Sequence, residues 1–331
     1  MGDPAGIGPD ITLAAWVARA RRDLPTFVLY GDPDTLSARA RKLGLDVPLE
    51  PVASLADAAS VFARALPVWP LPIRGPDVAA ADAAVVAAIE AAAAAAGAGA
   101  ALALVTNPIV KRTLNFAHLA YPGHTEFLAE LALRQGARTR PRPVMMLACD
   151  ELRVVPATVH IPLSAVPTAL TRPLLLETVR ITASALARDF GIAAPRIAVA
   201  GLNPHAGEGG LIGREETELI APVVVELAAA GIAVTGPHSA DTLFHAEARR
   251  AYDAAVTMYH DQALIPLKTL AFDSGVNVTL GLPFVRTSPD HGTAFALAGT
   301  GKARPDSFIA ALRLAGEIGR RRVGSDATLN P

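Results

Sequence analysis

The chain has 331 residues, 51% of them hydrophobic and 18% charged, with a formal net charge of −1. This length allows two α/β domains with sizeable cores. The dispersed basic residues exclude the basic face that nucleic-acid binding needs, and the single cysteine, Cys149, excludes an internal disulfide and fits a reducing cytoplasm.

The first residues, MGDPAGIGPDITLAAW, form a glycine-rich loop that leads into a helix with Pro9 and Asp10 in its first turn. Such a loop normally follows a strand, so we expect the native protein to start further upstream. Asp3 and Asp10 argue against a signal peptide. The longest uncharged run, residues 91–110, is rich in alanine and glycine and is interrupted by a proline, which argues against a membrane span. We therefore expect a soluble, cytoplasmic protein.

Short apolar segments alternate with amphipathic ones along the rest of the chain. A helix is predicted after Pro173, with Thr171 as its cap and Gly191 beyond its end, and another from Arg214 to Ala230. Strands are predicted at FVLYG (27–31), ALALVT (101–106), VMMLA (144–148), VVPATV (154–159), RIAVAG (196–201) and AAVTMY (254–259). This alternation predicts an α/β fold with a mostly parallel sheet.

Three histidines, His160, His205 and His260, lie at or just beyond the carboxyl ends of predicted strands. Ligands of open parallel sheets bind at that edge, and three imidazoles with an open position are typical of a catalytic metal site. Asp261 could orient a ligand or transfer a proton. Spacing alone also allows three solvated or hydrogen-bonded side chains. His118, His238 and His245 lack such placement and are expected to be structural or surface residues.

Other polar residues lie in loop-like segments punctuated by proline and glycine. Arginine, lysine and neutral donors of this kind can bind a phosphate or carboxylate, although each alone is more often a solvated surface residue. They are Lys111, His124, Thr125, Lys268, Asn277 and Arg286. Neither the first loop nor NPHAGEGGLIG (203–213) matches the GxGxxG dinucleotide fingerprint.

The blocks GDPAGIGP, PGHTEF, GLNPHAGEGG, DTLF, YHDQ and GVNVTLGLPFVRTSPDHGTA occur in this order. Together they resemble the 4-hydroxythreonine-4-phosphate dehydrogenases of vitamin B6 biosynthesis over essentially the whole chain. The resemblance implies a fold similar to isocitrate and isopropylmalate dehydrogenases, with two α/β/α domains and a cleft between them. By analogy, one domain comprises residues 1–110 and 270–331, and a central domain comprises residues 111–269.

The resemblance also implies a divalent metal ion bound by His160, His205 and His260. It implies a homodimer with shared active sites, in which one metal-ligating histidine comes from the second copy. The substrate contacts that it implies are His124, Thr125, Lys268, Asn277 and Arg286. Imidazole ligands favour zinc or cobalt, with magnesium and manganese left open.

A cofactor loop follows from the same resemblance. The stretch PDHGTAFALAGTGKARP is similar to the adenosine-binding loop of isocitrate and isopropylmalate dehydrogenases, which lack GxGxxG too. It assigns His291, Gly292 and Thr293 to NAD or NADP. Asn107, where the family has a small residue, and Val110, where it often has a polar one, depart from its pattern and leave room for a different substrate.

The expected reaction is NAD-dependent oxidation of 4-phosphooxy-L-threonine to a 3-oxo acid, which decarboxylates to 3-amino-2-oxopropyl phosphate. Asp241, Asp261 and Lys268 are the candidates for proton transfer, although turn or cap formation explains the aspartates nearly as well. Alternatives are a related dehydrogenase of 4-phospho-threonate or a cis-dihydrodiol carboxylate, a metal-dependent hydrolase that activates water with the three histidines, and a catalytically silent binding protein.

Overall fold

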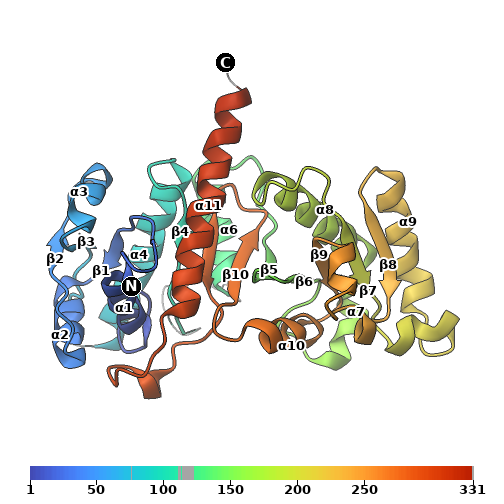
Figure 1. The fold of residues 1–331 in the computed structure, drawn as a ribbon, viewed down its shortest axis with the longest axis horizontal. Helices are drawn as coiled ribbons and strands as arrows, with labels where there is room; N and C mark the ends of the chain where they lie inside the picture. The colour runs from blue at the N-terminus through green and yellow to red at the C-terminus, as the bar shows by residue number, and fades with distance from the viewer. Residues whose placement is uncertain (76, 111–112, 114–122, 330–331) are drawn as a thin grey trace. The chain divides into compact units, whose positions relative to one another are not determined.

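The computed structural model describes residues 1–75, 77–110, 113 and 123–329, with side chains up to residue 324. The chain divides into two compact units, each built from separate stretches of sequence (Figure 1). The first unit comprises Met1–Pro143 and Leu282–Arg320, and the second comprises Val144–Gly281 and Arg321–Pro331. Each unit combines helices with strands, and the expected mixed α/β fold with a largely parallel sheet is confirmed.

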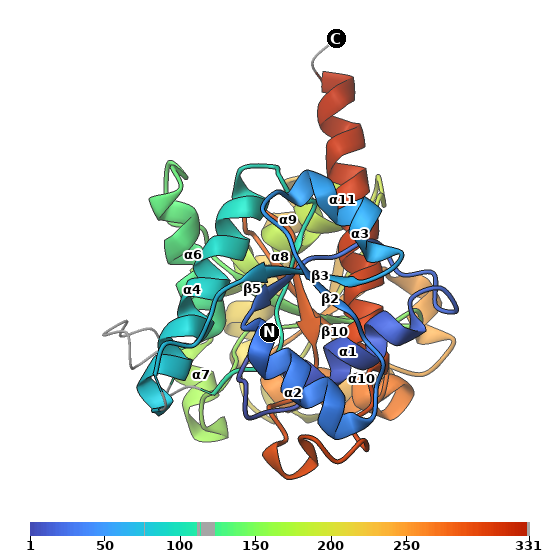
Figure 2. The ribbon, with the colours of Figure 1, turned by 90° about the vertical axis from the view of Figure 1, so that its left-hand side faces the viewer.

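In the first unit, three short strands pair in parallel in the order β1-β3-β2, and β4 pairs in parallel with β11. The strands are β1 (Leu29–Gly31), β2 (Leu49–Pro51), β3 (Leu66–Pro70), β4 (Leu104–Val105) and β11 (Arg286–Pro289). The helices are α1 (Gly8–Ala18), α2 (Pro33–Leu43), α3 (Ala58–Phe62), α4 (Val78–Gly97) and α6 (His124–Arg134), with α11 (Asp306–Leu329) near the chain's end. Short 3-10 turns are η1 (Leu55–Asp57) and η7 (Phe295–Leu297). In Figure 2, the helices α2 and α3 and the strands β2 and β3 face the viewer.

Helix α4 packs against β1 and α6 within this unit. Among the described residues it is the one helix long and apolar enough, by length and composition, to cross a membrane, with a mean hydropathy of 1.8. Its buried residues Val85, Ile89 and Ala93 recur every fourth position, so they form one stripe. That stripe belongs to a core cluster with Phe127 of α6, as in a helix packed on a globular core.

In the second unit, six strands follow the order β10-β5-β6-β9-β7-β8. They are β5 (Val144–Ala148), β6 (Arg153–Pro156), β7 (Ile197–Ala200), β8 (Val234–His238), β9 (Ala254–Thr257) and β10 (Val276–Leu280). The pairs of β5 with β10 and β6 are antiparallel, and the pairs β6–β9, β9–β7 and β7–β8 are parallel. The three strands that precede the predicted metal ligands are therefore parallel neighbours.

Helices α8 and α10 both pack on these strands, and α9 packs on β8 (Figure 1). The helices are α7 (Val166–Ala169), α8 (Arg172–Arg188), α9 (Ala221–Ala229) and α10 (His260–Ala271), with shorter helical turns η2 (Leu163–Ala165), η3 (Pro204–Gly210), η4 (Glu216–Ile220), η5 (Ala240–Thr242) and η6 (Ala248–Ala251). The predicted cap is confirmed, because the Thr171 side chain accepts a hydrogen bond from the Leu174 amide. The helix expected from Arg214 instead begins as a π-helical turn, η4, before α9.

Candidate functional site

The three candidate metal ligands all follow neighbouring strands of the second unit. His160 comes after β6, His205 after β7 and His260 after β9. Since β6, β9 and β7 pair in parallel, their carboxyl ends lie at the same edge of the sheet, as the sequence predicts.

His160 and His260 lie close together at this edge. Their ring centroids are 5.5 Å apart, with the ring planes tilted by 45°. His260 is the first residue of α10, and its side chain is 35% exposed. His160 is exposed and has a φ of 49°, a conformation that is unfavourable for a residue with a Cβ.

His205 lies in a left-handed turn. The φ angle is 51° at His205, 51° at Ala206 and 44° at Glu208, so three non-glycine residues share the strained conformation. Such strain persists only where the surrounding structure enforces it, and it often marks a functional site. The buried carboxylate of Glu216 supplies part of that enforcement, since its Oε1 accepts hydrogen bonds of 2.7 Å from the amides of Leu202 and Asn203.

Two aspartates accompany the histidines. Oδ1 of Asp261 lies 2.7 Å from Nδ1 of His260, so the carboxylate can fix the ring and leave Nε2 for another partner. Asp241 is exposed, and its pKa is held below the ordinary value, chiefly by a hydrogen bond from the Ser239 hydroxyl and also by the charge of His205. Both aspartates therefore interact with a predicted metal ligand.

Within the described parts of the chain, no three side chains of His, Cys, Asp or Glu form a group that could hold a metal ion. The structure thus brings His160 and His260 together and does not add His205 to them as a third ligand of one ion. The three-histidine metal site stays a prediction.

Lys268 and Asn277, two predicted substrate contacts, also belong to the second unit. Lys268 lies in α10 with its Nζ 5.5 Å from the centre of the Phe272 ring. Asn277 lies in β10, and its Oδ1 is buried and lacks a hydrogen-bond partner among the described residues. A buried amide oxygen of this kind is expected to bind a donor.

The first unit holds a buried arginine. Arg286 opens β11 and is 5% exposed, and its Nε and Nη2 donate to the Thr106 hydroxyl at 3.1 and 2.6 Å. Burial lowers the pKa of Arg286 to about 10, so the guanidinium stays charged at neutral pH. A buried guanidinium can bind an anionic group through charge-assisted hydrogen bonds.

His124 belongs to the same unit as Arg286. Burial of its ring, with the positive charge of Arg286 adding to it, lowers the pKa of His124 well below the ordinary value. Its Nε2 is buried without a hydrogen-bond partner in the described part of the chain. The neighbouring Thr125 donates from its hydroxyl to Oε2 of Glu126 at 2.9 Å. A neutral imidazole beside a cation can donate a hydrogen bond to a phosphate or carboxylate.

Asn107 follows β4 and shares this polar region through Thr106. Its Nδ2 donates to the Thr12 hydroxyl at 2.8 Å, whereas its Oδ1 is buried with no partner in the described residues. Gly2 lies against it, since a Cβ on Gly2 would come within 2.7 Å of the Asn107 Cβ. Lys111 and His118 lie outside the described residues.

The predicted cofactor loop is tied to the glycine-rich loop at the start of the chain. The Ile7 amide donates to the Thr293 carbonyl at 3.0 Å, and the Gly299 amide donates to Oδ1 of Asp10 at 2.6 Å. His291 and Gly292 are exposed. The cofactor loop is therefore attached to the first loop and helix of the chain at Thr293 and Gly299, whereas His291 and Gly292 remain exposed.

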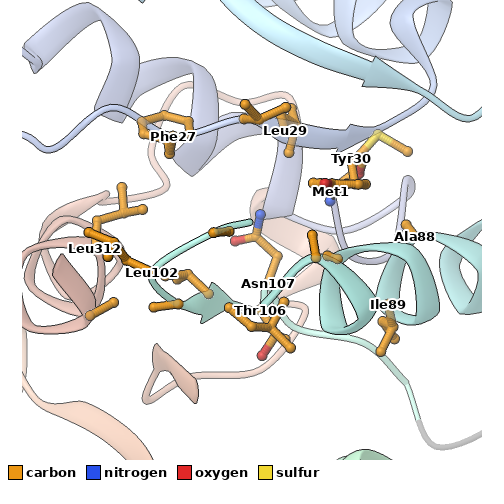
Figure 3. A pocket seen from close by; sticks show the side chains of 18 of the residues that line it. Met1, Phe27, Leu29, Tyr30, Ala88, Ile89, Leu102, Thr106, Asn107 and Leu312 are labelled. Atoms are coloured by element: carbon orange, nitrogen blue, oxygen red, sulfur yellow. Dashed lines mark hydrogen bonds between the residues drawn. The ribbon is translucent and has the colours of Figure 1, made fainter. Parts of the chain in front are cut away.

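A cavity of about 330 Å³ also lies in the first unit (Figure 3). Most of its lining is apolar, from Phe27, Leu29, Ile89, Leu102 and Leu312, with Thr106, Asn107 and His124 as polar members. Its apolar walls do not suit the phosphates of a dinucleotide or of a small substrate. The polar members of the lining, rather than its apolar walls, belong to the candidate site.

Four residues that hydrogen-bond to the segments described above have no role expected from the sequence: Thr106, Glu216, Gln262 and Thr158. Thr106 is the last residue of a predicted strand, and a polar residue at the carboxyl end of a strand could have been predicted to belong to a site. Gln262 is the last letter of the YHDQ block. For Glu216 and Thr158, nothing in the local pattern distinguishes a buried hydrogen-bonding side chain from an exposed one.

Comparison with known proteins agrees with this architecture. A family model described as pyridoxal phosphate biosynthetic protein PdxA matches residues 23–315. A 4-hydroxythreonine-4-phosphate dehydrogenase from Xanthobacter autotrophicus is 54% identical over 336 residues, 99% of this chain and 94% of the relative. A solved 4-hydroxythreonine-4-phosphate dehydrogenase from Klebsiella pneumoniae has a TM-score of 0.79 and 37% identity, and covers 96% of both chains. A solved terephthalate 1,2-cis-dihydrodiol dehydrogenase from Burkholderia xenovorans has a TM-score of 0.62 and 30% identity over 96% of both chains.

The α/β fold and these relatives define the class of protein as an oxidoreductase that acts on a CH–OH group. The chain belongs to the PdxA family of pyridoxal phosphate biosynthetic proteins. The family expected from the six sequence blocks is confirmed, and the interpretation as a hydrolase or a silent binding protein is replaced by that of a dehydrogenase in pyridoxal phosphate biosynthesis.

Proposed function

We propose that the protein oxidises 4-phosphooxy-L-threonine at C3 with NAD or NADP, and that the resulting 3-oxo acid decarboxylates to 3-amino-2-oxopropyl phosphate. The observation that carries the proposal is the pair of His160 and His260 at the carboxyl ends of parallel strands, with Asp261 against His260. Relatives more than 50% identical that are named for this substrate support it.

The donor chemistry fits a divalent metal ion. Two imidazoles approach each other, and the Asp261 carboxylate at Nδ1 of His260 orients that ring as such carboxylates do in metal sites. His160, His205 and His260 would hold the ion, and imidazole favours zinc or cobalt over magnesium. When bound, the ion would lower the pKa of the C3 hydroxyl and NAD would accept the hydride from C3.

The substrate's anionic groups would bind to the chain's cations and neutral donors. Arg286 is a buried cation, and Nε2 of His124 beside it has no hydrogen-bond partner among the residues that the structure describes. We assign these two residues, with Thr125, to the phosphate or carboxylate ends, together with Lys268 and Asn277 of the second unit. The exposed residues His291 and Gly292, together with Thr293, would contact the dinucleotide.

The chain must also accept the hydroxyl proton and return one after decarboxylation. Loss of hydride and proton makes a ketone at C3, which then takes up the electron pair of the C1–C2 bond as carbon dioxide leaves. A proton delivered to C2 completes the product. Asp241, Asp261 and Lys268 are the candidates, and the hydrogen bond from the Ser239 hydroxyl, which lowers the pKa of Asp241, favours its ionised form. Asp261, which already contacts His260, is better placed to orient that ring.

The proposed active form is a homodimer with shared sites. A single copy brings His160 and His260 together, and the third ligand would be a histidine of the second copy. Mixing a His160→Ala protein with a His205→Ala protein, each inactive alone, tests this arrangement. Heterodimers should regain one complete site and part of the turnover, whereas a single-chain site predicts no recovery.

A second candidate substrate is a cis-dihydrodiol carboxylate, favoured by the similarity to the terephthalate dihydrodiol dehydrogenase. A third, 4-phospho-threonate, differs from the first only at C2. An assay of NADH formation with these three substrates, with and without a chelator, separates the candidates. We expect turnover with 4-phosphooxy-L-threonine that the chelator abolishes. Turnover with only one of the other substrates, or turnover unaffected by a chelator, contradicts the proposal.

A further inference from the structure

The predicted cofactor loop has few apolar contacts that could fix its shape. Residues 290–305, all of which the structure describes, include none that is buried. Phe295 and Leu297 are 49% and 40% exposed, and the partly buried Ala298 and Ala303 pack against a core cluster of the first unit. A segment with so little buried apolar surface depends on hydrogen bonds for its conformation.

Asp10 supplies one of these hydrogen bonds. It lies in the first turn of α1 and is 3% exposed, and its Oδ1 accepts from the Gly299 amide at 2.6 Å. Gly299 has a φ of 71°, which glycine adopts without strain. A charged oxygen accepts such a bond more strongly than a neutral one. The carboxylate of Asp10 is costly to bury, however, unless a cation accompanies it.

Arg39 of α2 is that cation. Helices α1 and α2 pack against each other (Figure 2). Nη1 of Arg39 donates to Oδ2 of Asp10, and the Arg39 side chain is 12% exposed. The two oxygens of one carboxylate therefore serve different elements, because Oδ1 accepts from the cofactor loop and Oδ2 accepts from α2.

The same guanidinium also holds the glycine-rich first loop. Nη1 donates to the Gly6 carbonyl at 2.9 Å, and Nη2 donates to the Pro4 carbonyl at 3.0 Å. This first loop touches the cofactor loop, since a Cβ on Gly6 would come within 3.0 Å of the Thr293 carbonyl oxygen. The Ile7 amide donates to that carbonyl as well. Arg39 thus supports two points at which the cofactor loop is attached.

An arginine suits this position because of its geometry. A guanidinium directs several donors along fixed directions in one plane, so it can hold a carboxylate and two carbonyls at set relative positions. A lysine would bring the same charge without that geometry. A buried ion pair contributes little net stability compared with apolar residues of similar volume, so a conformational role accounts better for this pair than stability alone.

We propose that Arg39 and Asp10 are positioning residues for the dinucleotide, and that they hold the cofactor loop in the conformation that binds it. The inference rests on the proposed assignment of His291, Gly292 and Thr293 to NAD or NADP. It adds two residues that act through the backbone of the loop. A loop already held in its binding conformation loses less conformational entropy when the ligand binds, so the pair raises the affinity for the dinucleotide.

Calorimetric titration of the purified full-length protein with NADH and with NADPH tests this inference. Asp10→Asn keeps the shape of the side chain and removes its charge. We expect the Kd to rise about 10-fold, which corresponds to the loss of one hydrogen bond to a charged group. The matched control is Asp32→Asn, because Asp32 is also buried and accepts from a backbone amide, that of Thr35. It should lower the Tm by a similar amount and leave the Kd unchanged.

The kinetic constants separate positioning from a purely structural role. In Asp10→Asn the KM for the dinucleotide should rise, whereas kcat at saturating dinucleotide should stay close to that of the unaltered protein. A role in folding alone would reduce the amount of active protein and leave the KM unchanged, which contradicts the proposal. Arg39→Lys should raise the KM less than Arg39→Met, since it keeps the charge and loses the planar group.

The outcomes also distinguish this inference from the proposed function. If the unaltered protein binds neither NADH nor NADPH, the proposed cofactor is wrong and the positioning role fails with it. If it binds one of them and Asp10→Asn binds that dinucleotide equally well, only the positioning role is wrong. Should Asp10→Asn fail to fold, Arg39→Lys decides, with a severalfold rise in Kd expected.

Amide exchange in the dinucleotide-free protein provides a second readout. The Gly299 amide should exchange faster in Asp10→Asn than in Asp32→Asn, because only the first substitution weakens its acceptor. Equal exchange rates at Gly299 in the two variants contradict the proposal.

Discussion

Arg286 and Nε2 of His124 in the first unit are shielded from solvent, whereas His160 and His205 in the second unit are exposed. Burial leaves the first pair with a charged guanidinium and with an imidazole nitrogen that has no hydrogen-bond partner in the described part of the chain. In the second unit, the backbone of His160 and His205 is strained, and buried hydrogen bonds hold the strand ends that precede the histidines. The difference suggests two tasks, binding of anionic groups in one region and ligation of a metal in the other. Substitutions in each region should therefore fail in different ways.

Removal of His205 should give the largest effect. We expect His205→Ala to lose metal and to lower turnover by about 10³-fold. The proposed metal ligands act as a unit, so the loss of one removes nearly the whole catalytic effect. Metal content by atomic absorption and NADH formation measure the two effects. His245→Ala, an exposed histidine without a proposed role, is the matched control and should keep both. Full metal content and turnover in His205→Ala contradict the metal site.

Replacement of Arg286 tests the other region. Arg286→Lys keeps the charge but loses the planar group that bonds twice to the Thr106 hydroxyl. We expect kcat/KM to fall by about 10²-fold, equivalent to about 3 kcal/mol, with the bound metal unchanged. Arg172→Lys, at an exposed ion pair with Glu226, should have no effect on either. Loss of metal from Arg286→Lys would show that the two regions are not independent in the way proposed.

A smaller change is expected at Asp261. Asp261→Asn keeps the shape of the side chain and removes the charge that accompanies Nδ1 of His260. Removing such a carboxylate typically weakens metal binding by about 10- to 100-fold. Titration with Co²⁺ measures the Kd of the metal. The affinity for substrate at saturating metal should not change. If turnover falls far more than metal affinity, Asp261 transfers the proton instead.

Part of the second unit could be predicted because several of its strands are short apolar runs. The segments at 144–148, 196–201 and 254–259 contain β5, β7 and β9, and the histidines follow the expected strand ends. Parallel strands bring their carboxyl ends together whatever the loops do, so the shared edge needed no knowledge of side-chain contacts.

Other features depend on contacts between distant residues. Strand β11 reads Arg-Thr-Ser-Pro and is buried throughout, which no hydrophobic pattern indicates. Its polar side chains can be buried because they form hydrogen bonds with other elements. For example, the Thr287 hydroxyl donates to the Ala311 carbonyl. The π-helical turn at 216–220 and the left-handed turn at His205 likewise depend on the position of Glu216.

The shielding of His124 predicts a pH dependence of stability, the smallest effect considered. Its folded pKa lies below the ordinary value of 6.5, so below that pH the unfolded chain binds more protons than the folded one. The free energy of unfolding should therefore fall as the pH drops below the unfolded pKa, by at most about 1.4 kcal/mol per pH unit for this one group. Urea unfolding between neutral and acidic pH measures the slope. His124→Gln should flatten it, whereas His245→Gln, at an exposed position, should keep it. If the two variants give the same slope, His124 is not shielded, and the contrast between a buried anion site and an exposed metal site is lost.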